Sequence, residues 1–139
     1  MANGDNFTPD QLREHIKPIE AIRKDIENYA QSEGLDTTFH SKGWPDARLD
    51  WINKHEIHCT IELGMDQDMT SYILAIGAHK DVEGKRYIFM THLEKDLKTP
   101  FDAVSILEKI KAAKVLCDSK RFEDLPLSKR DQKGTRGTV

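Results

Sequence analysis

The stretch that decides the fold runs from His55 to Leu93 and reads HEIHCTIELGMDQDMTSYILAIGAHKDVEGKRYIFMTHL. It contains three alternating or apolar runs, separated by polar segments at Gly64–Met69 and Asp81–Gly84. Short apolar runs bounded by turn residues are typical of β-strands. The stretch therefore predicts three consecutive antiparallel strands joined by tight turns.

The three runs differ in how their apolar residues are distributed. The first run, 55–63, alternates strictly, whereas the later runs, 71–78 and 86–93, are apolar on both sides. Turns centred between Asp66 and Gln67 and between Glu83 and Gly84 would align His58, Ala75 and His92 across the sheet. One face then collects Ile57, Cys59, Ile61, Tyr72, Leu74, Ile76, Tyr87 and Phe89. The other face collects Ile73, Ala75, Gly77, Ile88 and Met90.

A second apolar face needs a cover, because monomers rarely leave a large apolar patch exposed. We expect one helix on each face. The alternatives are a C-terminal tail that folds back, a second copy of the chain bound through the open face or a sheet edge, and a different protein partner.

Helix signals flank the strands on both sides. Thr8-Pro9-Asp10-Gln11 is a capping-box pattern, and apolar residues follow it at helical spacing as far as Gly34. Pro18 predicts a kink or a break near Lys17, because proline lacks the backbone N–H group. A second helix is predicted from Thr99-Pro100. Its apolar stripe runs through Phe101, Val104, Leu107, Ile110 and Ala113 and is widened by Ile106 and Cys117.

The order of elements predicts an α+β fold. We expect an antiparallel meander sheet of three or four strands, flanked by an N-terminal and a C-terminal helix in two or three layers. A polar connector is expected at 36–42, and a short strand at 49–51. The predicted domain spans residues 1–118, and residues 119–139 form a basic, polar C-terminal tail.

Length and charge exclude several classes of protein. The chain has 139 residues, which suits one domain, and its net charge of −3 argues against a uniformly basic nucleic-acid binder. No apolar run is long enough to span a membrane, and the start of the chain resembles no secretory signal. The sum of charges conceals an acidic body and a tail with six basic residues: Lys120, Arg121, Lys129, Arg130, Lys133 and Arg136.

Motifs for chemistry are missing from the sequence. Cys59 and Cys117 are interpreted as structural thiols in a reducing compartment, so we expect a cytoplasmic protein. The six histidines lack a chelating spacing, and no phosphate-binding, dinucleotide or nucleophile motif is present. We therefore predict no catalytic residue, no metal site and no cofactor.

One segment has the composition of a binding hot spot, because Trp44 and Trp51 flank Arg48. The favoured alternative is that both tryptophans simply pack on the sheet edge and the first helix. The candidate interface comprises these three residues together with the apolar second face: Trp44, Arg48, Trp51, Ile73, Ile88 and Met90.

No stretch matches a family signature, so the functional expectation rests on fold and surface. The leading hypothesis is a small intracellular, non-enzymatic protein that acts by protein–protein binding, as a regulator, adaptor, chaperone or inhibitor, and in one version as a homodimer. The first alternative is a nucleic-acid-associated accessory protein that uses the basic tail. The second alternative is a metal-dependent, nuclease-like enzyme using Asp46, Asp50 and Glu62, although the following strand lacks the glutamate-x-lysine pair.

Overall fold

The computed structural model describes residues 7–40 and 43–131 of the chain. Two N-terminal helices, α1 (Pro9–Glu20) and α2 (Arg23–Glu33), precede five strands. The strands are β1 (Asp36–Phe39), β2 (Asp46–Ile52), β3 (His58–Met65), β4 (Tyr72–Val82) and β5 (Lys85–Leu97). Helix α3 (Ala103–Asp118) and a short 3₁₀ helix (Phe122–Asp124) follow.

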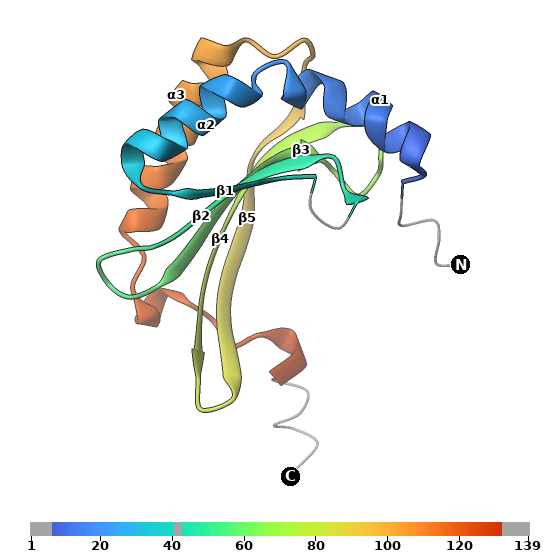
Figure 1. The fold of residues 1–139 in the computed structure, drawn as a ribbon. Helices are drawn as coiled ribbons and strands as arrows, with labels where there is room; N and C mark the ends of the chain where they lie inside the picture. The colour runs from blue at the N-terminus through green and yellow to red at the C-terminus, as the bar shows by residue number, and fades with distance from the viewer. Residues whose placement is uncertain (1–6, 41–42, 132–139) are drawn as a thin grey trace.

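The five strands form one antiparallel meander in the order β1-β2-β3-β4-β5, which confirms the α+β fold (Figure 1). The sheet has one strand more than expected, because the connector at 36–42 contains β1. Thr37 and Thr38 of β1 pair with Leu49 and Arg48 of β2. β-branched threonines suit such a half-exposed edge strand, although their polarity resembles that of a loop.

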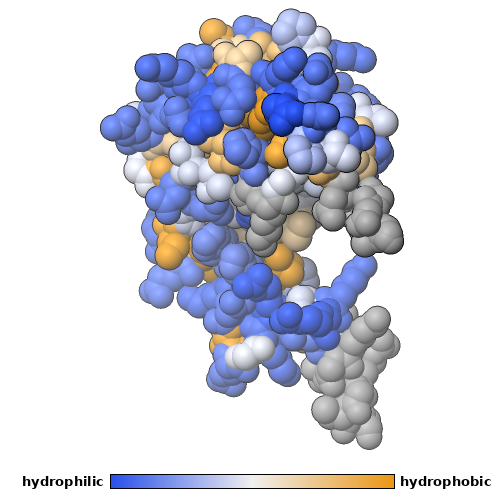
Figure 2. Space-filling view, turned by 45° about the vertical axis from the view of Figure 1, so that its right-hand side comes forward, coloured by the Kyte–Doolittle hydropathy of each residue, from blue (hydrophilic) through white to orange (hydrophobic). Residues whose placement is uncertain are grey.

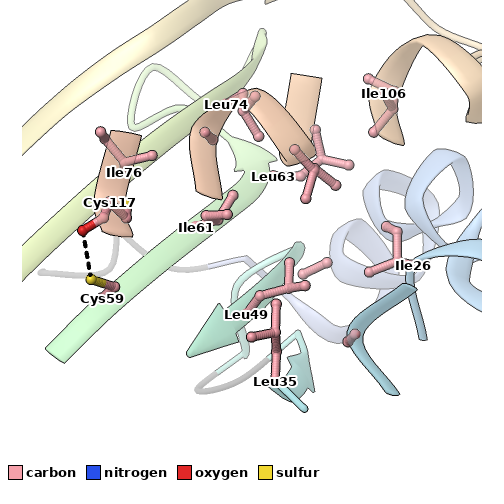
Figure 3. Packing of buried hydrophobic residues seen from close by; sticks show 14 of the residues in the cluster. Ile26, Leu35, Leu49, Cys59, Ile61, Leu63, Leu74, Ile76, Ile106 and Cys117 are labelled. Carbon is pink, nitrogen blue, oxygen red and sulfur yellow. Dashed lines mark hydrogen bonds between the residues drawn. The ribbon is translucent and has the colours of Figure 1, made fainter. Parts of the chain in front are cut away.

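All three helices pack on the same face of the sheet, so the prediction of one helix on each face is wrong (Figure 1). The buried residues of the helices and the helix-facing side chains of the strands form one core (Figure 3). Its helix members include Ile26 and Ile106, and its strand members include Leu49, Ile61 and Leu74. The predicted membership of the two faces is correct. The face with Ile73, Ala75 and Met90 carries no helix within the described residues.

The β3–β4 register differs from the prediction. Ala75 pairs with His92 as expected, but its partner on β3 is Glu62, whereas His58 pairs with His79. The turn extends to Ser71, because the Asp66 N–H group donates to the Ser71 carbonyl (2.7 Å) and Asp68 accepts bonds from Thr70 and Ser71. The register moves by an even number of residues, which leaves every side chain on its predicted face.

Both helical regions begin or break at places other than those expected. The Thr8 capping box forms as predicted, but the break falls at Ala21 and Ile22 instead of near Lys17. One missing N–H group at Pro18 removes a single helical bond, and the helix continues to Glu20, where the Ala21 N–H group still donates to the Lys17 carbonyl (3.0 Å). Helix α3 begins after Asp102, because Phe101 lies outside the helix. The Phe101 ring packs edge-on against the Tyr72 ring, with the ring centroids 5.3 Å apart.

The buried residues of α3 all belong to the expected stripe, but they form only one side of it. Ile106, Ile110, Ala113 and Cys117 are buried, whereas Val104 is 67% exposed. Apolar residues occur on nearly every side of this helix, so the sequence supports more than one stripe.

Candidate functional site

The candidate site is the sheet face that carries no helix, which we call the open face. β4 places two small residues on this face, Ala75 opposite His92 and Gly77 opposite Met90 on β5. Glycine and alanine cannot fill the space above a curved sheet, so a hollow remains. Figure 2 shows hydrophobic atoms inside a hollow below the helical layer, bordered by hydrophilic ones.

This hollow is a groove of about 910 Å³ that runs from β2 across the sheet to β5. Its apolar part includes Trp44, Ile73, Ala75 and Met90. The charged and polar groups that line it are Asp46, Arg48, Glu62, Asp66, Gln67, Thr91, His92 and Lys95. Acidic and basic groups both border the groove, so neither sign of charge dominates it.

A polar network borders the groove on β2 and β3. Asp50 accepts a hydrogen bond from the Thr60 hydroxyl (2.6 Å), and its Oδ1 atom lies 3.3 Å from Nε2 of His58. Nη2 of Arg48 lies 3.9 Å from the same oxygen, which is beyond hydrogen-bond distance. The Nε atom of Arg48 is buried and makes no hydrogen bond with any described residue. Arg48 therefore retains donor capacity beside the groove.

Two histidines extend this network toward the β4–β5 hairpin. The rings of His58 and His79 stack, with centroids 4.6 Å apart and an interplanar angle of 22°. Burial lowers the pKa of His79, and the nearby Arg86 and His58 lower it further. Asp81 and Asp50 also face this ring and act in the opposite direction.

The lowered pKa of His79 predicts a loss of stability in mild acid. The unfolded chain takes up this proton near pH 6.5, whereas the folded protein takes it up only at lower pH. The contribution is therefore complete above about pH 6.5 and is lost as the pH falls through the folded-state pKa. Urea unfolding at pH 7.5 and pH 5 should show a smaller acid-induced loss for His79→Gln than for the wild type. Equal losses would contradict the prediction.

The structure brings together only part of the predicted interface. Trp44, Arg48, Ile73 and Met90 line the groove, and Ile88 lies on the same face beside His79. Trp51 instead points to the helix-covered face, where its Nε1 group donates to Asp118 of α3 (2.8 Å). Trp44 donates to the Met65 carbonyl (2.8 Å) and packs against Phe7. Both tryptophans thus have packing roles, and Trp44 also forms a wall of the groove.

Residues 119–131 of the predicted tail lie against β5. The Ile88 N–H group donates to the Pro126 carbonyl, and the Ser128 N–H group donates to the Arg86 carbonyl, both at 2.8 Å. Leu125 is buried, and Asp131 accepts a bond from the Arg86 N–H group (2.6 Å). This segment forms one isolated antiparallel β-bridge, Leu127 opposite Tyr87, on one part of the β5 edge.

The basic residues of the tail are dispersed in the described segment. Lys120 lies over the Phe89 ring at 4.2 Å, and Arg130 is 3.7 Å from Asp131. Arg121 and Lys129 are exposed. Lys133 and Arg136 lie outside the described residues. A nucleic-acid role for the tail stays a prediction.

The β5 edge beyond the tail segment was not singled out by the sequence. In a strand, alternate residues point their backbone groups to the same side. The backbone N–H and C=O groups of Met90 and His92 therefore point to the same side as those of Ile88, which is the side away from β4. No other described segment makes a backbone hydrogen bond to them. Both side chains are exposed, Met90 to 72%.

The two cysteines are buried and form no disulfide. The Cys59 thiol donates to the Cys117 carbonyl at 3.3 Å (Figure 3). The adjoining Cys59 thiol and burial raise the pKa of Cys117, so this thiol stays protonated. Among residues 7–40 and 43–131, no group of three or more histidine, cysteine or acidic side chains is arranged to hold a metal ion.

Asn53 is a structural residue that sequence reasoning missed. It is 6% exposed, and its Nδ2 group makes two hydrogen bonds to the end of α3, while its Oδ1 atom accepts two within the β2–β3 loop. An asparagine before a lysine and a histidine resembles an ordinary turn residue, so only its neighbours in space reveal this role.

Comparisons with known proteins add no assignment to this geometry. No protein-family model matches the chain, and neither a curated protein nor a solved structure matches it significantly. Within the part of the chain that the structure describes, no helix has the length and apolar character needed to cross a membrane.

Proposed function

We propose that this protein binds other proteins by accepting an extended segment as an added strand at the edge of β5. The observation that carries the proposal is the pairing of the protein's own segment, Pro126–Ser128, with Arg86 and Ile88 on that edge. Its two main-chain hydrogen bonds are of the kind that a bound segment would make with Met90 and His92 on the rest of the edge. Unpaired strand edges bind extended peptides through main-chain hydrogen bonds.

The free part of the edge adjoins this pairing directly. The tail segment runs antiparallel to β5, and a continuation would bring it next to Met90 and His92. The chain leaves the edge before that point, because Leu125 turns into the core and residues 122–124 form a 3₁₀ helix. A partner segment therefore continues an interface that already exists within the chain.

The free edge is too short to favour a second copy of the chain as the occupant. A stable protein–protein interface takes roughly 20–30 residues a side. The free edge between the tail segment and the irregular pairing near Glu94 spans only about Phe89 to Leu93. A peptide segment needs less area, because its main chain supplies much of the binding energy.

We further propose a cytoplasmic location, to which the two free thiols are suited.

The change Met90→Pro tests the proposal, because it removes one outward N–H group and leaves the bonds between β4 and β5 intact. Proline is tolerated at a position whose N–H faces away from the sheet. Peptides selected from a displayed library of random dodecapeptides on the wild-type protein should bind Met90→Pro at least about tenfold more weakly in fluorescence anisotropy. Met90→Ala, which keeps the N–H group, is the matched control.

Two outcomes would contradict the proposal. One is that selected peptides bind Met90→Pro as tightly as Met90→Ala, while circular dichroism shows both variants folded. The other is that no peptide is enriched and sedimentation velocity shows wild-type dimers that Met90→Pro abolishes, which would make a second copy the occupant.

A further inference from the structure

The free edge and the groove share two residues. Met90 and His92 point backbone groups away from β4, and their side chains line the groove on the open face. A strand added beside them places every second side chain on the open face, next to these two residues. Any segment that binds the edge therefore presents side chains to the mouth of the groove.

The floor of the groove lies two strands away from such a segment, so only a long or aromatic side chain meets it. Ala75 is the direct neighbour of His92 on β4, and Gly77 is the direct neighbour of Met90. Aromatic and long side chains reach diagonal neighbours on an adjacent strand at about 7–8 Å, but β4 lies one strand beyond β5, about 10 Å from an added strand. A side chain on that strand meets Ala75 only if it lies across β5. Met90 is flexible and exposed, so it can move aside or pack on an incoming group.

The groove suits an uncharged apolar group better than a charged one. Trp44, Ala75 and Met90 supply apolar surface, while acidic and basic groups both border the groove. A mixed border attracts neither sign of charge strongly, whereas displacement of water from the apolar part favours an apolar occupant. The volume of about 910 Å³ leaves ample room for an aromatic ring.

We propose that the groove is a specificity pocket that takes a large apolar side chain, aromatic or long aliphatic, from a segment bound at the β5 edge. This inference rests on the proposed function and names the chemistry of the partner: an extended segment with a bulky apolar residue at one open-face position. Main-chain bonds at Met90 and His92 hold the segment, and the groove selects its sequence.

The change Ala75→Leu tests the pocket, because it fills the floor and leaves every backbone group of β5 unchanged. Dodecapeptides selected on the wild-type protein should share a bulky apolar residue, and Ala75→Leu should weaken their binding at least tenfold. Ala75→Ser keeps the volume small and should bind within about twofold of the wild type. Replacing the bulky residue of the peptide with alanine should weaken binding to the wild type tenfold but hardly change binding to Ala75→Leu. That comparison on the wild-type protein remains decisive if Ala75→Leu does not fold.

The outcomes separate this inference from the proposed function. Peptides that lose affinity for Met90→Pro but bind Ala75→Leu normally, or that share no bulky residue, would overturn the pocket and leave strand addition in place. Peptides that lose affinity for Ala75→Leu but bind Met90→Pro normally would overturn strand addition instead. Loss of affinity for both variants, together with the effect of the peptide alanine, supports both.

Discussion

Replacing Asn53 with Asp should destabilise the protein by about 3 kcal/mol at neutral pH, because it reverses the polarity of a buried contact. Nδ2 of Asn53 donates to the carbonyls of Cys117 (2.9 Å) and Lys120 (3.0 Å). Oδ1 accepts from the N–H groups of His55 (2.9 Å) and Ile57 (3.0 Å). A carboxylate keeps the second pair of bonds but turns an oxygen toward two carbonyl oxygens.

The pH dependence of this variant identifies the cause of the loss. Burial and the two carbonyls should raise the pKa of the new carboxyl group in the folded state. The penalty is then largest above that pKa and shrinks as the pH falls toward about 4, where the unfolded chain also becomes protonated. A protonated carboxyl group donates one bond again, so part of the stability returns.

Asn53→Ala is the matched comparison, because it removes the bonds without adding a charge. Urea unfolding at pH 7.5 and pH 4.5 should show that Asn53→Asp is the less stable variant at the higher pH. The gap between the two variants should narrow at the lower pH. If both variants lose the same stability at both values, the two carbonyls do not face this side chain.

The faces of the sheet were predictable from the sequence, because side-chain direction depends only on whether a position is odd or even. Ile73, Ala75 and Met90 are on the predicted face although the β3–β4 turn is centred elsewhere than expected. The register depends on how the turn closes, and the bonds of Asp66 and Asp68 determine that. Aspartates in a polar loop do not reveal these bonds in advance.

The arrangement of the helices was not predictable, because it depends on which apolar face is larger and on how the connections run. The stripe from Ile106 to Cys117 and the stripe through Val104 and Leu107 are both apolar in sequence. Only packing against the sheet decides between them. The position of β1 likewise depends on a partner strand, since Thr37 and Thr38 pair with β2 but carry no strong strand signal of their own.

The candidate site was predicted only in part, and for a related reason. The apolar members of the open face follow from alternation along the strands. The groove depends on which residues of β2 to β5 lie side by side, and the free edge depends on where the tail leaves β5. Both are relations between distant segments, so a reading of local patterns found the face but neither the hollow in it nor the edge beside it.

Replacing Gly64 with Ala should cost about 1–3 kcal/mol, because β3 and the start of β2 approach each other too closely for a side chain there. A Cβ atom on Gly64 would lie 2.6 Å from Cβ of Asp46 and 3.1 Å from the Pro45 carbonyl oxygen. Asp46 pairs with Gly64 across the two strands, and the Met65 N–H group donates to the same carbonyl (3.1 Å). Relief of the clash would therefore stretch a hydrogen bond and move the end of the strand.

Gly77→Ala is the matched control, since Gly77 lies on the same face, one strand away. Its new Cβ atom would meet nothing closer than Cγ of Met90 at 3.7 Å, which is an ordinary contact. Thermal and urea unfolding should therefore place Gly77→Ala within about 0.5 kcal/mol of the wild type and Gly64→Ala well below it. Equal stability of the two variants would mean that β2 and β3 lie farther apart at this point. The end of the groove nearest Trp44 would then be wider, because the same close approach sets the position of Asp46 in its wall.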